Sequence, residues 1–159
     1  DPFIFGRGYE EILYARKLGI KTSYIPGISA LQTLGYEDVP LTHRNINDGF
    51  WVMTGTKADG SLTADLELAM QSNATVVIYM GMKKLSLIAS VYINNGFSSI
   101  PAAIIQHASL PLKKCVKATI GELPNLAATH DLKHPALIVI GKVVDVEAYV
   151  EISALAERR

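Results

Sequence analysis

The stretch Ile25–Arg44 reads IPGISALQTLGYEDVPLTHR and decides how the rest of the chain is interpreted. A Pro-Gly pair at Pro26 ends an apolar run, because this dipeptide marks a turn. Ser29 follows where a short helix is expected to begin, and a serine there satisfies free backbone N–H groups. A second turn at Pro40 leads into the basic pair His43–Arg44. Any one of these features alone is typical of an ordinary loop in an α/β layer.

Composition sets the broad class of the protein. The chain has 159 residues, of which 49% are hydrophobic and 19% are charged, so we expect a globular domain with a sizeable core. Lys plus Arg equals Asp plus Glu at 15 each, which argues against a nucleic-acid partner. The single cysteine, Cys115, excludes an internal disulfide and fits a reducing compartment, the cytoplasm. No apolar run is long enough to span a membrane and no signal peptide is visible, so we expect no membrane association.

The apolar patterns predict an α/β fold in which helices and strands alternate. In the first part of the chain we expect an amphipathic helix over Tyr9–Leu18, a strand over Ile20–Ile25 and a short helix over Ile28–Leu34. The stretch Gly49–Gly55 reads as a buried strand, with Trp51 in the core.

The remaining elements continue the alternation. The β-branched run Thr75–Tyr79 is typical of a strand buried on both faces. The short loop between Pro101–His107 and Lys113–Thr119 predicts an antiparallel pair and therefore a mixed sheet. The other expected elements are helices over Ser61–Gln71, Lys83–Asn94, Gly121–Thr129 and Val146–Ala156, and a buried strand over Pro135–Gly141.

Several motifs occur in an order that a known family shares. The chain opens with DPFIFGRG; PGISA and PLTHR follow within the stretch quoted above; VIYMG, QHAS and PALIVIG come later. Together they resemble the uroporphyrinogen-III C-methyltransferases of the tetrapyrrole methylase family, and the resemblance covers nearly the whole chain. QHAS departs from this family at Gln106 and His107, where Glu-Asn is commoner, so we expect no charge-dependent role at Gln106.

The resemblance implies the α/β tetrapyrrole methylase fold, with a mixed sheet flanked by helices and most of the N-terminal domain missing. Residues 1–45 are then the remnant of that domain, and residues 46–159 form a C-terminal α/β domain with a terminal helix. The implied reaction is methylation of uroporphyrinogen III by S-adenosylmethionine, giving precorrin-2 for sirohaem and cobalamin, by a homodimer. As a fragment, the chain is expected to be inactive and to bind the cofactor weakly or not at all.

The resemblance also implies site residues. Substrate carboxylates are expected to contact the basic side chains Arg7, His43 and Arg44. The proposed acid and base groups of the family lie upstream of this chain, so no catalytic residue is assigned. The cofactor is expected to contact Asp1, Ile4, Ser29, Ala30, Met80, Ala108 and Ala136.

Structural roles compete with these assignments. Asp1 is equally consistent with a loose terminus, Arg7 with a helix cap, and the His43–Arg44 pair with an internal salt bridge. Met80 is the usual type of core filler, and a lone histidine such as His107 is more often structural than catalytic. No histidine or cysteine spacing fits a metal site. Two functional alternatives stay open: a non-catalytic scaffold or dimerisation fragment, and a methyltransferase acting on a later precorrin.

Overall fold

The computed structural model describes residues 1–57 and 59–150. The chain divides into two compact units: residues 1–32 are the first unit and residues 33–159 the second. Among the described residues, no helix has both the length and the apolar character needed to cross a membrane.

The first unit contains helix α1 (Gly8–Lys17), which confirms the predicted helix over Tyr9–Leu18. Gly19 follows the helix with φ +75°, a left-handed conformation that glycine adopts easily when it ends a helix. No residue of α1 is buried.

The predicted strand over Ile20–Ile25 is wrong: residues 20–29 contain neither strand nor helix. A strand needs a neighbour that pairs with its N–H and C=O groups, and within the described residues none pairs with this segment. Ile25 is accordingly 82% exposed. Residues 30–37 form the 3₁₀ helix η1 (Ala30–Glu37), in place of the helix expected over Ile28–Leu34.

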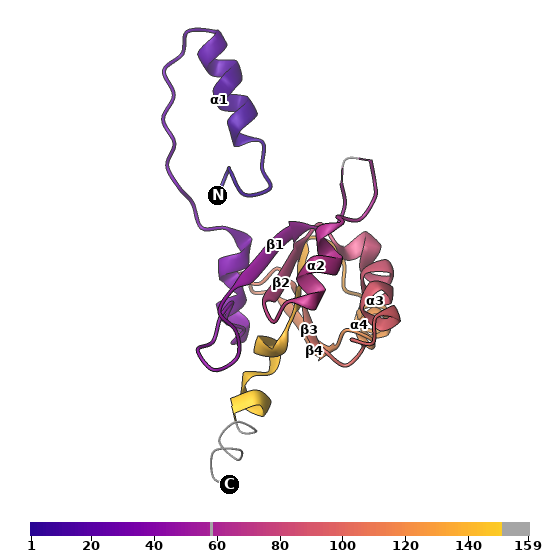
Figure 1. Ribbon diagram of the computed structural model, residues 1–159. Helices are drawn as coiled ribbons and strands as arrows, with labels where there is room; N and C mark the ends of the chain where they lie inside the picture. Colours follow the sequence, from indigo (N-terminus) through magenta and orange to yellow (C-terminus); the bar gives the residue numbers. More distant parts are fainter. Residues whose placement is uncertain (58, 151–159) are drawn as a thin grey trace. The chain divides into compact units, whose positions relative to one another are not determined.

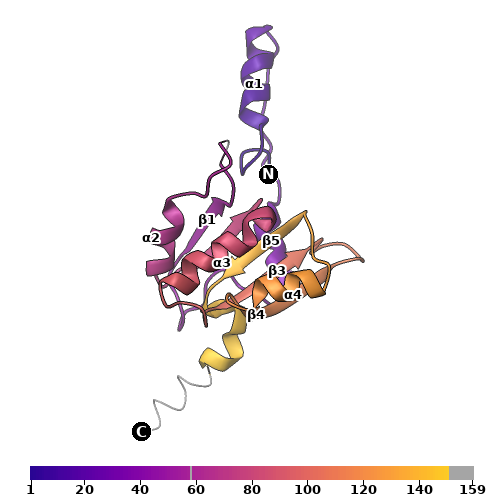
Figure 2. The same cartoon turned by 90° about the vertical axis from the view of Figure 1, so that its right-hand side faces the viewer.

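The second unit contains a mixed sheet of five strands: β1 (Phe50–Thr54), β2 (Thr75–Tyr79), β3 (Pro101–Gln106), β4 (Lys114–Thr119) and β5 (Ala136–Ile140). Their order across the sheet is β1-β2-β5-β3-β4 (Figures 1 and 2). β1 and β2 are parallel, whereas β5 is antiparallel to both of its neighbours, and β4 is antiparallel to β3. The predicted antiparallel pair and mixed sheet are therefore confirmed.

This topology gives the sheet two distinct ends. We call the carboxyl end the one at which β1, β2 and β3 finish and β4 and β5 begin; the amino end is the opposite one. Open α/β sheets bind their ligands beyond the carboxyl ends of the strands.

Three helices cover one face of the sheet (Figure 2). They are α2 (Asp65–Gln71), α3 (Leu85–Asn94) and α4 (Leu123–Thr129). Two further 3₁₀ helices are η2 (Met82–Lys84) and η3 (Lys142–Asp145). Residues 146–150 are helical, and the rest of the helix predicted over Val146–Ala156 lies outside the described residues.

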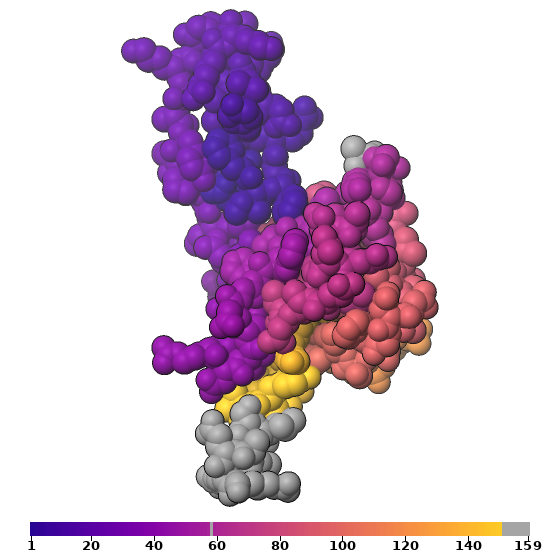
Figure 3. Space-filling model, in the orientation of Figure 1, coloured from indigo at the N-terminus to yellow at the C-terminus, as the bar shows by residue number. Residues whose placement is uncertain are grey.

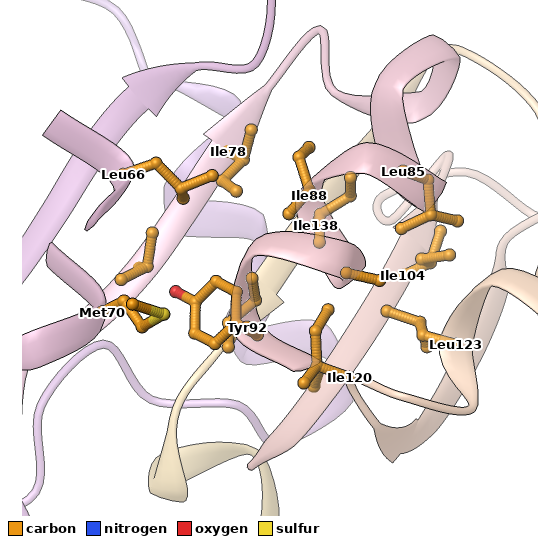
Figure 4. Packing of buried hydrophobic residues seen from close by; sticks show 14 of the residues in the cluster. Leu66, Met70, Ile78, Leu85, Ile88, Tyr92, Ile104, Ile120, Leu123 and Ile138 are labelled. Atoms are coloured by element: carbon orange, nitrogen blue, oxygen red, sulfur yellow. The ribbon is translucent and has the colours of Figure 1, made fainter. Parts of the chain in front are cut away.

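The core between the helices and the sheet is almost purely apolar (Figure 4). Tyr92 of α3 lies at its centre, 1% exposed, and its hydroxyl is directed toward Met70. This hydroxyl has no hydrogen-bond partner among the described residues, and burial raises its pKa.

The interpretation of Gly49–Gly55 as a buried strand with Trp51 in the core is wrong in its burial. β1 is an outer strand of the sheet, and of its residues Met53 alone is buried. Trp51 is 37% exposed, because one side of an outer strand lacks a neighbouring strand to cover it. By contrast, β2 is buried over its first four residues, as its β-branched run predicted.

Candidate active site

Three of the predicted cofactor residues meet at the carboxyl end of the sheet. Met80 directly follows β2, Ala108 lies two residues beyond β3, and Ala136 is the first residue of β5. Gln106 pairs with Ala136 across β3 and β5, and the register of β2 with β5, continued by two residues, brings Met80 to the same level. The second unit therefore gathers residues from three strands that are far apart in sequence.

Met80 is not a core residue. It is 57% exposed and its backbone has φ +53°, a left-handed conformation that is uncommon outside glycine. Its carbonyl oxygen accepts a hydrogen bond from Thr56 Oγ1 at 3.2 Å, which ties the turns after β1 and β2 together. An exposed methionine in a strained turn fits a ligand-facing position better than core packing.

Two glycines allow the turns after β1 and β2 to touch. A Cβ added at Gly55 would lie 2.5 Å from the Cα of Gly81, and a Cβ added at Gly81 would lie 2.7 Å from Ile138 Cδ1. Glycine permits such close backbone approach. Sequence reasoning missed this pair, although both glycines stand directly after an apolar strand run, in the sequences WVMTG and VIYMG.

In the first unit, the carboxylate of Asp1 accepts hydrogen bonds from three residues. Its Oδ1 accepts from the N–H of Phe3 at 2.8 Å, and its Oδ2 accepts from the N–H of Gly27 at 3.1 Å and from the hydroxyl of Tyr24. The ring of Phe3 stacks on that of Tyr24 with centroids 4.3 Å apart. The first loop is thus bound to the Pro-Gly turn, which argues against the loose-terminus interpretation of Asp1.

Ser29 directly precedes η1, and the side chain of Gln32 caps its backbone N–H. Its N–H donates to Gln32 Oε1 at 2.6 Å, while the N–H of Gln32 donates to the Ser29 carbonyl at 3.0 Å. The glutamine of an S-x-x-Q pattern reaches back in this way in a capping box. Ser29 is 4% exposed and Ala30 follows as the first residue of η1, whereas Ile4 is 39% exposed in the first loop.

Arg7 is exposed at the N-cap position of α1, and its side chain makes no capping hydrogen bond there. The helix-cap alternative for this residue is therefore not supported. Its guanidinium remains a candidate for an anionic group.

His43 and Arg44 lie in a loop at the amino end of the sheet, which Asn47 holds in place. Asn47 Oδ1 accepts from the N–H of His43 at 2.9 Å, and Nδ2 donates to Thr75 Oγ1 at 2.9 Å and to the Gly49 carbonyl at 2.8 Å. Asn47 is 5% exposed. Sequence reasoning missed it, because an asparagine in a loop gives no indication of partners 28 residues away.

The structure thus separates the predicted residues of the second unit into two groups. Met80, Ala108 and Ala136 lie at the carboxyl end, and the His43–Arg44 pair lies at the amino end. In Figure 3 this loop projects from the surface of the second unit. Within residues 1–57 and 59–150 neither His43 nor Arg44 forms an ion pair, so the salt-bridge alternative is not supported.

A groove of about 1160 Å³ in the second unit contains none of the predicted site residues. It lies at the amino end, where β3 begins and β4 finishes. Its charged side chains are mostly acidic: four carboxylates, Asp38, Glu122, Asp145 and Glu147, and one lysine, Lys117. This charge disfavours a ligand that carries several carboxylates.

The single cysteine is not an activated nucleophile. Burial, and then the charge of Glu37, raise the pKa of the Cys115 thiol, so the reactive thiolate is disfavoured. Glu37 Oε1 lies 2.6 Å from Lys113 Nζ, and this contact raises the pKa of Lys113.

In the part of the chain that the structure describes, no three His, Cys, Asp or Glu side chains cluster as metal ligands would.

The comparison with protein families agrees with the motifs. Residues 1–124 match the Tetrapyrrole (Corrin/Porphyrin) Methylases. The chain belongs to the tetrapyrrole methylase family.

Curated relatives of this tetrapyrrole methylase chain include siroheme synthases. The protein from Chromobacterium violaceum is 39% identical over 147 residues, covering 91% of this chain and 31% of the relative. The protein from Thiobacillus denitrificans is 38% identical over 146 residues, covering 91% and 30%. The chain therefore spans about a third of the length of these relatives.

Solved structures share the fold. The uroporphyrin-III C-methyltransferase from Thermus thermophilus, crystallised with S-adenosyl homocysteine, is 31% identical with a TM-score of 0.77, over 92% of this chain and 64% of that one. A cobalt precorrin-4 methyltransferase has a TM-score of 0.81 at 19% identity, over 91% and 62%, and shows the fold alone. The predicted fold class and family are confirmed.

Proposed function

We propose that the protein containing this chain transfers methyl groups from S-adenosylmethionine to uroporphyrinogen III, giving precorrin-2. The observation that carries the proposal is the 31% identity to the Thermus thermophilus uroporphyrin-III C-methyltransferase, a protein crystallised with S-adenosyl homocysteine. The likeness to siroheme synthases supports the same step in tetrapyrrole metabolism. The later-precorrin alternative rests on a neighbour of 19% identity and is the weaker candidate.

The chemistry requires little from the protein beyond positioning. A sulfonium methyl is already activated, so the main task is to hold donor and acceptor in line. At the carboxyl end, Met80 is exposed while Ala108 and Ala136 are small, which suits a slot for a nucleoside. We propose that the cofactor contacts these three residues, and also Asp1, Ile4, Ser29 and Ala30 of the first unit.

The tetrapyrrole carries several carboxylates, which arginine recognises well because its planar donors match a carboxylate. We propose Arg7, His43 and Arg44 as contacts for these groups. All three are at least partly exposed. Their tests are separate, because His43 and Arg44 lie at the amino end of the sheet, away from Met80, Ala108 and Ala136.

The direct experiment incubates the full-length protein with S-adenosylmethionine and uroporphyrinogen III and measures the product by mass spectrometry. We expect a mass increase of two methyl groups and the formation of S-adenosylhomocysteine. Methylation of a later precorrin with no turnover of uroporphyrinogen III would replace this proposal by its alternative. Cofactor binding without turnover of either substrate would favour the non-catalytic scaffold.

We also propose a homodimer in the cytoplasm. The first unit leaves apolar side chains uncovered, with Ile25 at 82% and Ile28 at 78% exposure, and such surface favours association. The half-buried free thiol of Cys115 fits a reducing compartment. Sedimentation of the full-length protein at high concentration tests the assembly, and a monomer there contradicts it.

A further inference from the structure

The turn after β3 contains a polar residue that the proposed function does not yet use. His107 is the first residue past β3, as Met80 is the first residue past β2. β5 runs between these two strands, with Ala136 at its start. His107 therefore lies at the carboxyl end of the sheet, between Ala108 and the Gln106 that pairs with Ala136.

The backbone of His107 is in the same unusual conformation as that of Met80. Both have φ +53°. Asp38 and Asp131 also have positive φ, but they directly follow η1 or the cap of α4, where a left-handed residue is the ordinary way to end a helix. A strand end has no such need, and strained residues of this kind concentrate where ligands bind.

The two side chains at the end of β3, those of Gln106 and His107, differ in their hydrogen bonding. Gln106 is 9% exposed and its Oε1 accepts from the N–H of Lys133 at 2.9 Å, so it holds the loop before β5. The imidazole of His107 is half-buried and makes no hydrogen bond to any residue that the structure describes. An imidazole has two ring nitrogens that take part in hydrogen bonds, and neither is used by a described residue here.

We propose that His107 is a ligand-contacting residue that hydrogen-bonds the polar part of an S-adenosyl nucleoside held at the carboxyl end. This assignment rests on the proposed function. In this proposal the turns after β2 and β3 have corresponding roles on the two sides of Ala136. The turn after β3 presents the polar side chain of His107 to the ligand, and the turn after β2 presents the apolar side chain of Met80.

The test separates the side chain of His107 from its backbone. His107→Gly removes the imidazole but accepts positive φ, and His107→Asn keeps a polar group in a residue that tolerates this conformation. Asp38→Gly is the matched control, because it makes the same backbone change past η1 at the amino end. S-Adenosylhomocysteine is titrated calorimetrically into the full-length protein and each variant, with urea unfolding as the check on folding.

We expect His107→Gly to unfold at the same or a higher urea concentration and to bind about 2- to 13-fold more weakly, the equivalent of one hydrogen bond. His107→Asn should recover part of the loss, and Asp38→Gly should bind like the unchanged protein. Unchanged affinity in folded His107→Gly overturns this assignment alone. No binding by the unchanged protein overturns both this assignment and the proposed cofactor.

Discussion

The carboxyl and amino ends of the sheet are built in different ways. At the carboxyl end, the backbone turns are packed against each other through Gly55 and Gly81, and Met80 is left exposed. At the amino end, a longer loop is held by the side chain of one buried asparagine, Asn47. The first arrangement surrounds an exposed Met80 with closely packed turns, where we propose that a ligand binds, whereas the second fixes a loop. A local change should therefore affect different properties at the two ends.

The largest expected effect is on ligand binding at the carboxyl end. Ala108→Leu adds three heavy atoms to the proposed nucleoside slot, and overpacking typically costs about 1–3 kcal/mol, or roughly 5- to 150-fold in affinity. Calorimetric titration of the full-length protein with S-adenosylhomocysteine measures it. Ala128→Leu on the exposed side of α4 is the control and should change nothing. Equal affinities for the two folded variants would remove Ala108 from the site.

A methyl group added to the glycine at each end of β1 should affect stability differently. At Gly55 a Cβ meets the Gly81 backbone at 2.5 Å, whereas at Gly49 nothing lies within 4 Å. We expect Gly55→Ala to lower the free energy of unfolding by about 1–3 kcal/mol, because the Gly81 backbone cannot move aside as easily as a flexible side chain. Gly49→Ala should be close to neutral. Urea unfolding of both variants measures this, and equal stabilities would contradict the tight crossing of the two turns.

Asn47→Ala tests the amino end. It removes the acceptor for the His43 N–H and a donor to Thr75, and such buried losses cost about 1–3 kcal/mol. We expect lower stability in urea with unchanged affinity for S-adenosylhomocysteine. Asn45→Ala, in the same loop but exposed, is the matched control. A loss of cofactor affinity in folded Asn47→Ala would mean that the two ends are coupled.

The smallest effect is expected in the core between the ends. Tyr92→Phe removes a buried hydroxyl that has no partner among the described residues. The variant should be as stable as the unchanged protein or more stable by up to about 1 kcal/mol, as judged by its urea midpoint. A clear loss of stability would show that the hydroxyl has a partner outside the described residues.

The sequence predicted best where hydrophobic patterns alone decide the structure. β2, β5 and α3 were found because burial on both faces, or on one helix face, leaves a periodic trace. The strand expected over Ile20–Ile25 failed because strand formation depends on a neighbour, which a local pattern does not contain. Trp51 was misplaced for the same reason: the position of β1 at the side of the sheet is a property of topology.

The candidate site was predictable only through family motifs. The positions of Met80, Ala108 and Ala136 follow strand runs that the sequence displays. These three residues come together at one end because β5 lies between β2 and β3 and is antiparallel to both. The positive φ of Met80 depends on the turn that follows β2. The role of Asn47 could not be predicted, because its partners come from the start of β2 and from its own loop.

The central place of β5 has a consequence for synthesis of the chain. β2 and β3 do not pair with each other; each pairs with β5, which is the last strand of the described residues. Until residue 140 has left the ribosome, the sheet exists as two separate halves, β1 with β2 and β3 with β4, each with an unpaired inner strand. Unpaired strand sides attract other chains, so the nascent protein passes through its most aggregation-prone stage just before this strand arrives. The residues that match the family end at 124, before β5 begins. A truncated version limited to them would remain in that open state.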